Sequence, residues 1–214
     1  ELENSLAAFR AAGRMGADAV ELDVHATADG ALFVHHDETI DGHPIAGLTG
    51  AEAAGFLLSN GEPLPTLAQA LHAIGPRLGV FIEVKSLPAQ FDGRLFETMD
   101  RGPNPPGYAV HGFDHRIVRR LGTARPALLR GVLSSAYPVR PLAVLEDAGA
   151  TMLWQERGVV DRGLVETLHG AGCRVFVWTV NDAREMGQLL SLGVDGICTN
   201  VPDVGRRAVD AVAA

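Results

Sequence analysis

The sequence predicts one α/β domain over residues 1–214 that folds as a TIM, or (β/α)₈, barrel. Three observations lead to this fold class. Segments with an apolar helical stripe, several of them ending at a glycine, alternate with short β-rich runs, which is typical of βα units and a parallel sheet. The β-rich runs are almost continuously apolar, as expected for strands that are buried on both faces. A length of 214 residues, 47% of them hydrophobic, is sufficient for one large core.

The β-rich runs provide seven candidate parallel strands. They are residues 19–24, 79–85, 108–113, 128–133, 151–155, 174–180 and 195–199. The run ALFVHHD at 31–37 is not an eighth, because six residues separate it from ELDV and a parallel crossover needs about a dozen or more. We expect this run to return antiparallel through a turn at residues 28–30, which makes a small β-hairpin insertion.

The helical segments alternate with these strands, and the first precedes them all. They are residues 5–14, 66–74, 114–122, 142–147, 161–168 and 181–192. Asn4 and Asn181 are the predicted N-caps of the first and last of them. The chain opens directly on its first helix, so the strand count is one short of a closed barrel. We expect the first barrel strand to lie before residue 1, because an open barrel would expose an unpaired edge.

Composition and charge exclude several classes of partner. The net charge of −8 at pH 7, without any Lys/Arg-rich run, argues against binding to nucleic acid or to an anionic membrane surface. No apolar run is long enough for a membrane helix, and the acidic start lacks the features of a signal peptide, so we expect a cytoplasmic protein without stable membrane insertion. Cys173 and Cys198 lie within apolar runs, and we expect both to be buried core residues. The oligomeric state is left open.

Three acidic residues form a candidate metal site. In AVELDV, Glu21 and Asp23 stand two positions apart, so both project from one face of a strand. Glu83 likewise stands between apolar residues late in the next parallel strand. The carboxyl ends of barrel strands open at one mouth, so we expect the three side chains to meet there. Neighbouring carboxylates repel unless a cation or a proton compensates them, and oxygen ligands favour Mg²⁺ or Ca²⁺ over zinc. Lys85, on the same face as Glu83, adds a positive charge suited to phosphate.

Two further side chains are candidates for the chemistry. His36 follows the returning strand beside Asp37, and a histidine near a metal-bound phosphate is the usual proton carrier at neutral pH. Trp178 stands at the carboxyl end of a strand, where it is either plain core or a wall of the substrate pocket. The sequence leaves both readings of Trp178 open. We assign His25 and His35 to structural roles.

The motifs resemble, in order, those of the glycerophosphodiester phosphodiesterases. The matching segments are ENSLAAF at 3–9, GADAVELDV at 16–24, FVHHDETID at 33–41, PTLAQAL at 65–71, FIEVK at 81–85, FD at 113–114, VWTVN at 177–181 and GVDGICTNVPD at 193–203. This resemblance implies a TIM barrel that hydrolyses glycerophosphodiesters to sn-glycerol 3-phosphate and an alcohol, using Ca²⁺ or Mg²⁺.

The resemblance also implies a role for each matching residue. Glu21, Asp23 and Glu83 match the family's metal ligands, His36 one of its two catalytic histidines, Lys85 its phosphate-contacting lysine, and Glu3 a glutamate that supports the site. In the family, a strand ending in His-Arg precedes the EN motif and carries the other histidine and an arginine. The segment after His36 is shorter than is usual in the family, and Gly112 replaces a common serine.

Two other functions remain open for the candidate site. The first is a lysophospholipase D-type phosphodiesterase, which would act on lipid-tailed substrates and would need an apolar surface around the mouth. The second is a non-catalytic barrel that binds a phosphate ligand, if the upstream His-Arg is truly lost. A small-molecule phosphodiester is the expected substrate or ligand in each case.

Overall fold

The computed structural model describes residues 1–213. The chain forms two compact units. The first contains residues 1–14 and 18–109, and the second contains residues 15–17 and the chain from residue 110 onward. Strand β6 (Tyr108–His111) begins in the first unit and continues into the second.

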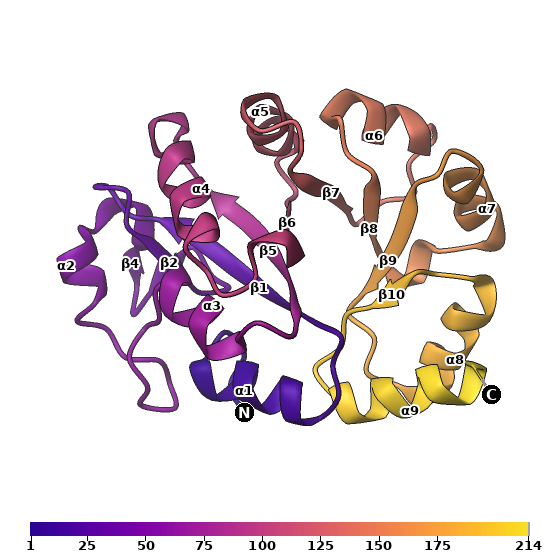
Figure 1. Cartoon of the computed structure of the whole chain (residues 1–214), viewed down its shortest axis with the longest axis horizontal. Coiled ribbons are helices and arrows are strands. Elements are labelled where there is room, and N and C mark those ends of the chain that lie inside the picture. Colours follow the sequence, from indigo (N-terminus) through magenta and orange to yellow (C-terminus); the bar gives the residue numbers. More distant parts are fainter. Residues whose placement is uncertain (214) are drawn as a thin grey trace. The chain divides into compact units, whose positions relative to one another are not determined.

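The first unit contains nine of the helices and strands that precede β6. In chain order they are α1 (Leu6–Arg14), β1 (Ala19–Ala26), β2 (Leu32–Val34), β3 (Thr39–Ile40), β4 (His43–Pro44), α2 (Gly50–Ala53), α3 (Leu67–Ile74), β5 (Gly79–Ser86) and α4 (Asp92–Asp100). Short 3₁₀ turns cover Ile45–Gly47, Ala89–Phe91 and Pro105–Gly107. Helix α1 packs on α3, and α3 packs on α4 (Figure 1).

Strand β1 is the centre of this unit's sheet, because it pairs on both edges. It is parallel to β5, and Asp23 stands opposite Glu83 in the register. It is antiparallel to β2, with Val24 opposite Val34. The predicted fold-back of the chain after ELDV is therefore confirmed, and the amide of Gly30 closes the turn by donating to the carbonyl of Thr27 at 3.0 Å.

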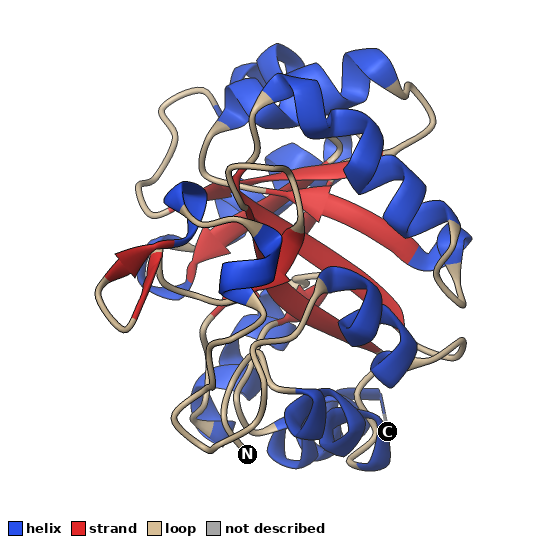
Figure 2. Cartoon of the chain, turned by 90° about the vertical axis from the view of Figure 1, so that its left-hand side faces the viewer, coloured by secondary structure: helices blue, strands red, loops and turns tan. Residues whose placement is uncertain are grey.

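The segment after β2 folds over a small core of its own. Strands β3 and β4 form a separate antiparallel ribbon, visible beside the larger sheet in Figure 2. Beneath this segment lies a cluster of buried apolar side chains: Phe33, Ile40, Ile45, Ala53, Leu58 and Leu64. This cluster fixes the path of the chain on both sides of His36, so the histidine follows a strand whose position is set by packing.

The hairpin turn has room only for glycine at position 30. Its φ is +81°, and a Cβ there would overlap the ring of Phe91. We expect Gly30→Ala to lower the free energy of unfolding by about 2–4 kcal/mol, the sum of backbone strain and overpacking. Gly42 is the matched control, because its φ is +78° and its Cβ would meet nothing within 4 Å. Gly42→Ala should cost only the backbone part, about 1–2 kcal/mol. Urea unfolding that gave equal losses for both variants would contradict this account.

The start of α1 departs from the prediction. Ser5, not Asn4, caps the helix, because the Ser5 hydroxyl accepts from the amide of Ala8 at 3.1 Å. Asn4 is buried, adopts a left-handed φ of +57°, and turns its amide toward Asp23. The prediction that Asn4 is the N-cap is therefore wrong, and its side chain serves a long-range contact instead.

The second unit continues the βα alternation. Its elements are α5 (His115–Ala124), β7 (Leu129–Ser134), α6 (Pro141–Ala148), β8 (Met152–Glu156), α7 (Arg162–Gly170), β9 (Arg174–Trp178), α8 (Ala183–Leu192), β10 (Gly196–Ile197) and α9 (Pro202–Ala213), with a 3₁₀ turn at Arg157–Val159. Strands β7, β8, β9 and β10 pair in parallel in that order. All seven predicted parallel runs thus contain a strand, namely β1, β5, β6, β7, β8, β9 or β10.

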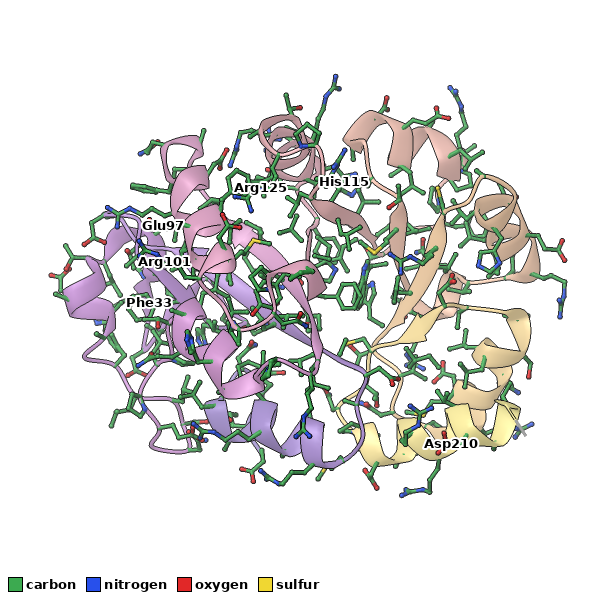
Figure 3. The ribbon with its side chains drawn as sticks, viewed as in Figure 1. Phe33, Glu97, Arg101, His115, Arg125 and Asp210 are labelled. Atoms are coloured by element: carbon green, nitrogen blue, oxygen red, sulfur yellow. The ribbon has the colours of Figure 1, made fainter. Side chains whose placement is uncertain are left out.

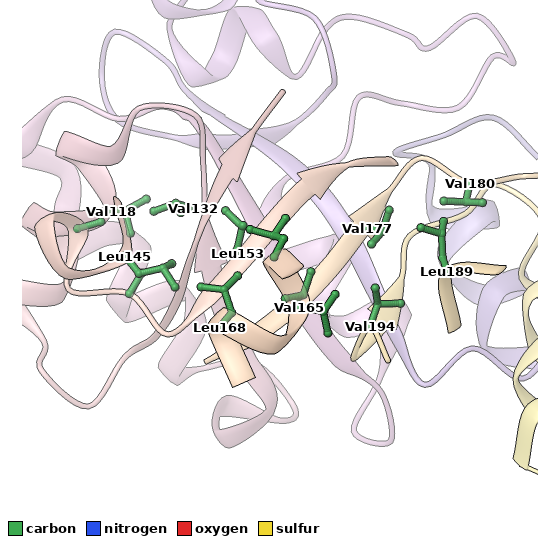
Figure 4. Packing of buried hydrophobic residues seen from close by; sticks show 14 of the residues in the cluster. Val118, Val132, Leu145, Leu153, Val165, Leu168, Val177, Val180, Leu189 and Val194 are labelled. Carbon is green, nitrogen blue, oxygen red and sulfur yellow. The ribbon is translucent and has the colours of Figure 1, made fainter. Parts of the chain in front are cut away.

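The core of this unit lies between its parallel strands and the helices that follow them. Side chains such as Val132, Leu153 and Val177 from the strands pack against Leu168 and Leu189 from the helices (Figure 4). These side chains are fully or almost fully buried. Their burial agrees with the apolar helical stripes and apolar strands of the sequence, which predicted helices packed against the sheet.

Aspartate side chains cap three of the helices in this unit, α5, α7 and α8. Asp114 and Asp161 accept from backbone amides at the starts of α5 and α7. The predicted Asn181 cap of α8 is wrong, because Asp182 accepts from the amide of Glu185 at 2.9 Å. The carbonyl oxygen of the Asn181 side chain instead accepts from the amide of Asn200 at 2.8 Å.

Cys173 and Cys198 are only half-buried, so the expectation of fully buried cysteines is wrong.

Glu97 and Arg101, one turn apart on α4, form an ion pair with 2.7 Å between Arg101 Nη2 and Glu97 Oε1 (Figure 3). Within residues 1–213, no helix has the length and apolarity needed to cross a membrane.

Candidate active site

The acidic cluster is assembled by two neighbouring strands. Glu21 and Asp23 come from β1 and Glu83 from β5, and each offers a carboxylate oxygen within 4.8 Å of the other two. The parallel register places Asp23 directly opposite Glu83, with Glu21 two residues earlier on the same face. Asp23 and Glu83 are buried, and Glu21 is half-buried. The three predicted ligands therefore lie together.

Lys85 bridges two members of the cluster. Its Nζ lies 3.0 Å from Asp23 Oδ1 and 2.8 Å from Glu83 Oε1. Burial disfavours the charged ammonium, but the hydrogen bond to Glu83 and the charge of Asp23 outweigh it and raise the pKa of Lys85. One ammonium offsets only one of three carboxylate charges, so the site still favours a further cation.

Without such a cation, the cluster retains protons. Burial and the neighbouring charge of Asp23 raise the pKa of Glu21 from 4.5 to about 8. Burial also raises the pKa of Glu83, against the opposing effect of Lys85, to about 7. A cation that binds here must displace protons, so affinity for the ion is expected to increase with pH.

These shifted pKa values predict how the stability of the ion-free protein depends on pH. Between the ordinary pKa of 4.5 and the raised values, the folded state binds more protons than the unfolded state. Stability is therefore retained at low pH and falls as the pH rises through the folded-state values. In EDTA, we expect the Tm to fall from about pH 5 to about pH 8, and added Ca²⁺ to reverse the fall.

The double variant Glu21→Gln/Glu83→Gln is the control for this trend, because it removes both titrating carboxyls and keeps their size. Thermal unfolding of this variant should lose most of the pH dependence in EDTA. A wild-type Tm that stays level or rises between pH 5 and 8 would contradict the assignment.

His36 lies on the loop that follows β2, and half of its side chain is exposed. Its Nδ1 lies 2.9 Å from Asp37 Oδ1. This hydrogen bond, more than any other contact, raises the pKa of His36, and the charge of Asp23 adds to the effect. The histidine therefore stands close enough to the acidic cluster to sense its charge, and it carries a proton more readily than a free imidazole does.

The remaining predicted site residues occupy different places. Glu3 is exposed, and its negative charge acts on both Glu21 and His36. Trp178 belongs to the second unit, at the end of β9, where its Nε1 donates to the carbonyl of Trp154 at 3.1 Å. Its ring meets that of Phe113 edge-on, with 5.6 Å between centroids. Trp178 is half-buried, so it has an exposed face as well as these contacts.

Two residues beside the cluster were not predicted. Asn4 was expected to cap α1 and instead contacts Asp23. His25 is buried beyond Asp23 on β1, with ring nitrogens 3.3 Å from Ser86 Oγ and 3.4 Å from the carbonyl of His36. The sequence did carry a signal for His25, because it stands two positions after Asp23 on the same strand.

Comparison with known proteins assigns the chain to a family. Residues 2–204 match the glycerophosphoryl diester phosphodiesterase family. The chain belongs to this family. Among its relatives are a glycerophosphodiester phosphodiesterase of Caldanaerobacter subterraneus subsp. tengcongensis, 31% identical over 94% of this chain and 89% of the relative, and a probable glycerophosphodiester phosphodiesterase of Mycobacterium tuberculosis, 30% identical over 95% and 83%.

Solved structures of the family agree on the fold. The crystal structure of a glycerophosphodiester phosphodiesterase from Parabacteroides distasonis superposes with a TM-score of 0.89 at 27% identity, over 99% of this chain and 92% of that one. The predicted TIM-type α/β barrel is therefore confirmed. Membership of the glycerophosphoryl diester phosphodiesterase family also confirms that the chain is a phosphoric diester hydrolase.

Proposed function

We propose that the protein hydrolyses glycerophosphodiesters to sn-glycerol 3-phosphate and an alcohol with the help of one divalent cation, Mg²⁺ or Ca²⁺. The observation that carries this proposal is the convergence of Glu21, Asp23 and Glu83 from two paired strands. The names of relatives about 30% identical to the chain support the substrate class.

The donor set fits a hard divalent cation. Three carboxylates supply oxygen ligands only, which is the chemistry that Mg²⁺ and Ca²⁺ prefer. The raised pKa values of Glu21 and Glu83 reflect the cost of burying these charges close together without a compensating ion. When bound, the cation would polarise the phosphoryl group and stabilise negative charge at its oxygens.

Lys85 would hold the phosphate from the side of β5. Its ammonium already lies among the carboxylates, and its raised pKa keeps it charged throughout the physiological range. A fixed positive charge in a partly buried position stabilises the charge that develops on phosphate oxygens in the transition state. Its backbone belongs to β5 and its ammonium contacts Asp23 and Glu83, so the charge is oriented before substrate binds.

His36 would act as the general acid. Asp37 holds its Nδ1, which leaves Nε2 to face a substrate, and the raised pKa favours the protonated ring that a general acid requires. The proton would pass to the oxygen of the departing alcohol. Glu3 would support this arrangement through its charge, which acts on both His36 and Glu21.

A paired substrate assay tests this proposal. Glycerophosphocholine in solution should yield sn-glycerol 3-phosphate and choline, while liposomes containing lysophosphatidylcholine should be cleaved much more slowly. Faster cleavage of the lysophospholipid would instead assign the lysophospholipase D-type activity. Binding of glycerophosphocholine without turnover, at saturating Ca²⁺ and at saturating Mg²⁺, would favour the non-catalytic phosphate-binding barrel.

A further inference from the structure

Asn4 has an unusual conformation for a residue next to a helix. It is one of two non-glycine residues among residues 1–213 with a positive φ, and it is 7% exposed. Asparagine tolerates the left-handed region better than most residues, but the conformation still costs free energy. Ser5 caps α1, so helix capping does not explain the presence of an amide at this position.

The amide of Asn4 makes two hydrogen bonds, and both are to Asp23. Its Nδ2 donates to Asp23 Oδ2 at 2.7 Å, and its Oδ1 accepts from the backbone amide of Asp23 at 3.2 Å. A single side chain therefore fixes the main chain and the carboxylate of the same residue. The backbone bond sets where the amide plane lies, and the second bond sets where the carboxylate points.

This contact determines how Asp23 presents its two oxygens. Oδ2 is held by Asn4, while Oδ1 lies 3.0 Å from Lys85 Nζ, on the side of Glu83. Repulsion from Glu21 and Glu83 would favour rotation of the Asp23 carboxylate away from the cluster. The donor of Asn4 is neutral, so it opposes this rotation without lowering the negative charge available to a cation.

We propose that Asn4 is a positioning residue that orients Asp23 for the divalent cation. This inference rests on the proposed function, because it concerns the same cation site. Hydrogen bonds to ligating carboxylates commonly tune metal affinity by about 10–100-fold. We infer that the left-handed backbone conformation of Asn4 is tolerated because it allows the side chain to reach Asp23, which lies 19 residues further along the chain on β1.

The test is isothermal titration calorimetry with Ca²⁺ and with Mg²⁺. Asn4→Gly removes the amide and accepts the same φ without strain. Asn4→Asp keeps the shape but places a second carboxylate against Asp23 Oδ2. We expect Asn4→Gly to raise the Kd about 10–100-fold and Asn4→Asp to raise it at least as much.

Asp41 provides the matched control, because it is exposed and is the other non-glycine residue with positive φ, at +49°. Asp41→Gly should leave the Kd within about twofold of wild type. If Asn4→Gly failed to fold, Asn4→Asp would carry the test alone. If the wild-type protein binds the ion and a folded Asn4 variant binds it with the same Kd, the role of Asn4 is overturned while the proposed cation site stands. Absence of ion binding by wild-type protein would instead overturn the proposed cation site, and the inference with it.

Discussion

Glu83→Gln should reduce kcat/KM for glycerophosphocholine by at least about 10³-fold and remove stimulation by divalent ions. Glutamine keeps the size of the side chain but removes a charge that contacts Lys85 and belongs to the acidic cluster. Loss of charge stabilisation at the phosphoryl oxygens is worth several kcal/mol, and each ~1.4 kcal/mol corresponds to about tenfold in rate. Steady-state assays across a titration of Ca²⁺ and Mg²⁺ measure the effect.

Glu97→Gln is the control for this variant. Glu97 is an exposed carboxylate on α4 that pairs with Arg101, so its loss changes the net charge equally without touching the cluster. The Glu97 variant should retain wild-type turnover. A Glu83→Gln protein that kept more than a tenth of wild-type activity, with an unaltered ion dependence, would show that Glu83 is not a ligand.

His36→Ala should lower kcat by about 10²–10⁴-fold, the usual contribution of a general acid or base. The fold should be unaffected, because about half of the side chain is exposed and its hydrogen bond is to the neighbouring, exposed Asp37. Circular dichroism and thermal unfolding verify the fold, and substrate titration separates kcat from KM.

His72→Ala is the matched histidine control, since His72 is exposed on α3 and bonds only the carbonyl of Ala68 among the described contacts. It should turn over at the wild-type rate. Asp37→Asn tests the same assignment by pH. It removes the negative charge from the group that bonds His36 Nδ1 and so weakens the interaction that raises the pKa of His36, and the alkaline limb of the rate profile should move to lower pH. Wild-type kcat in His36→Ala would exclude the histidine from the chemistry.

The strand positions of the site were predictable because they depend on local periodicity. Glu21 and Asp23 share one face through their spacing of two, and Lys85 follows Glu83 by the same rule. The short link before Leu32 required an antiparallel return, which the pairing of Val24 with Val34 confirms. What the sequence does not contain is the register between β1 and β5, which places Asp23 opposite Glu83.

The errors arose where a local rule and a long-range contact competed for the same side chain. Asn4 and Asn181 both satisfy the N-cap preference, but each has a neighbour, Ser5 or Asp182, that caps equally well. The asparagine is thereby available for a partner distant in sequence, Asp23 or Asn200. Propensity ranks the candidates for a cap, whereas tertiary structure decides which one is used.

The most direct test of the central claim is hydrolysis of glycerophosphocholine followed by ³¹P NMR, first in EDTA and then after addition of excess Ca²⁺ or Mg²⁺. The account predicts no conversion in EDTA and, after the ion is added, a phosphodiester signal that is replaced by that of sn-glycerol 3-phosphate. Full conversion in EDTA would contradict a cation held by Glu21, Asp23 and Glu83.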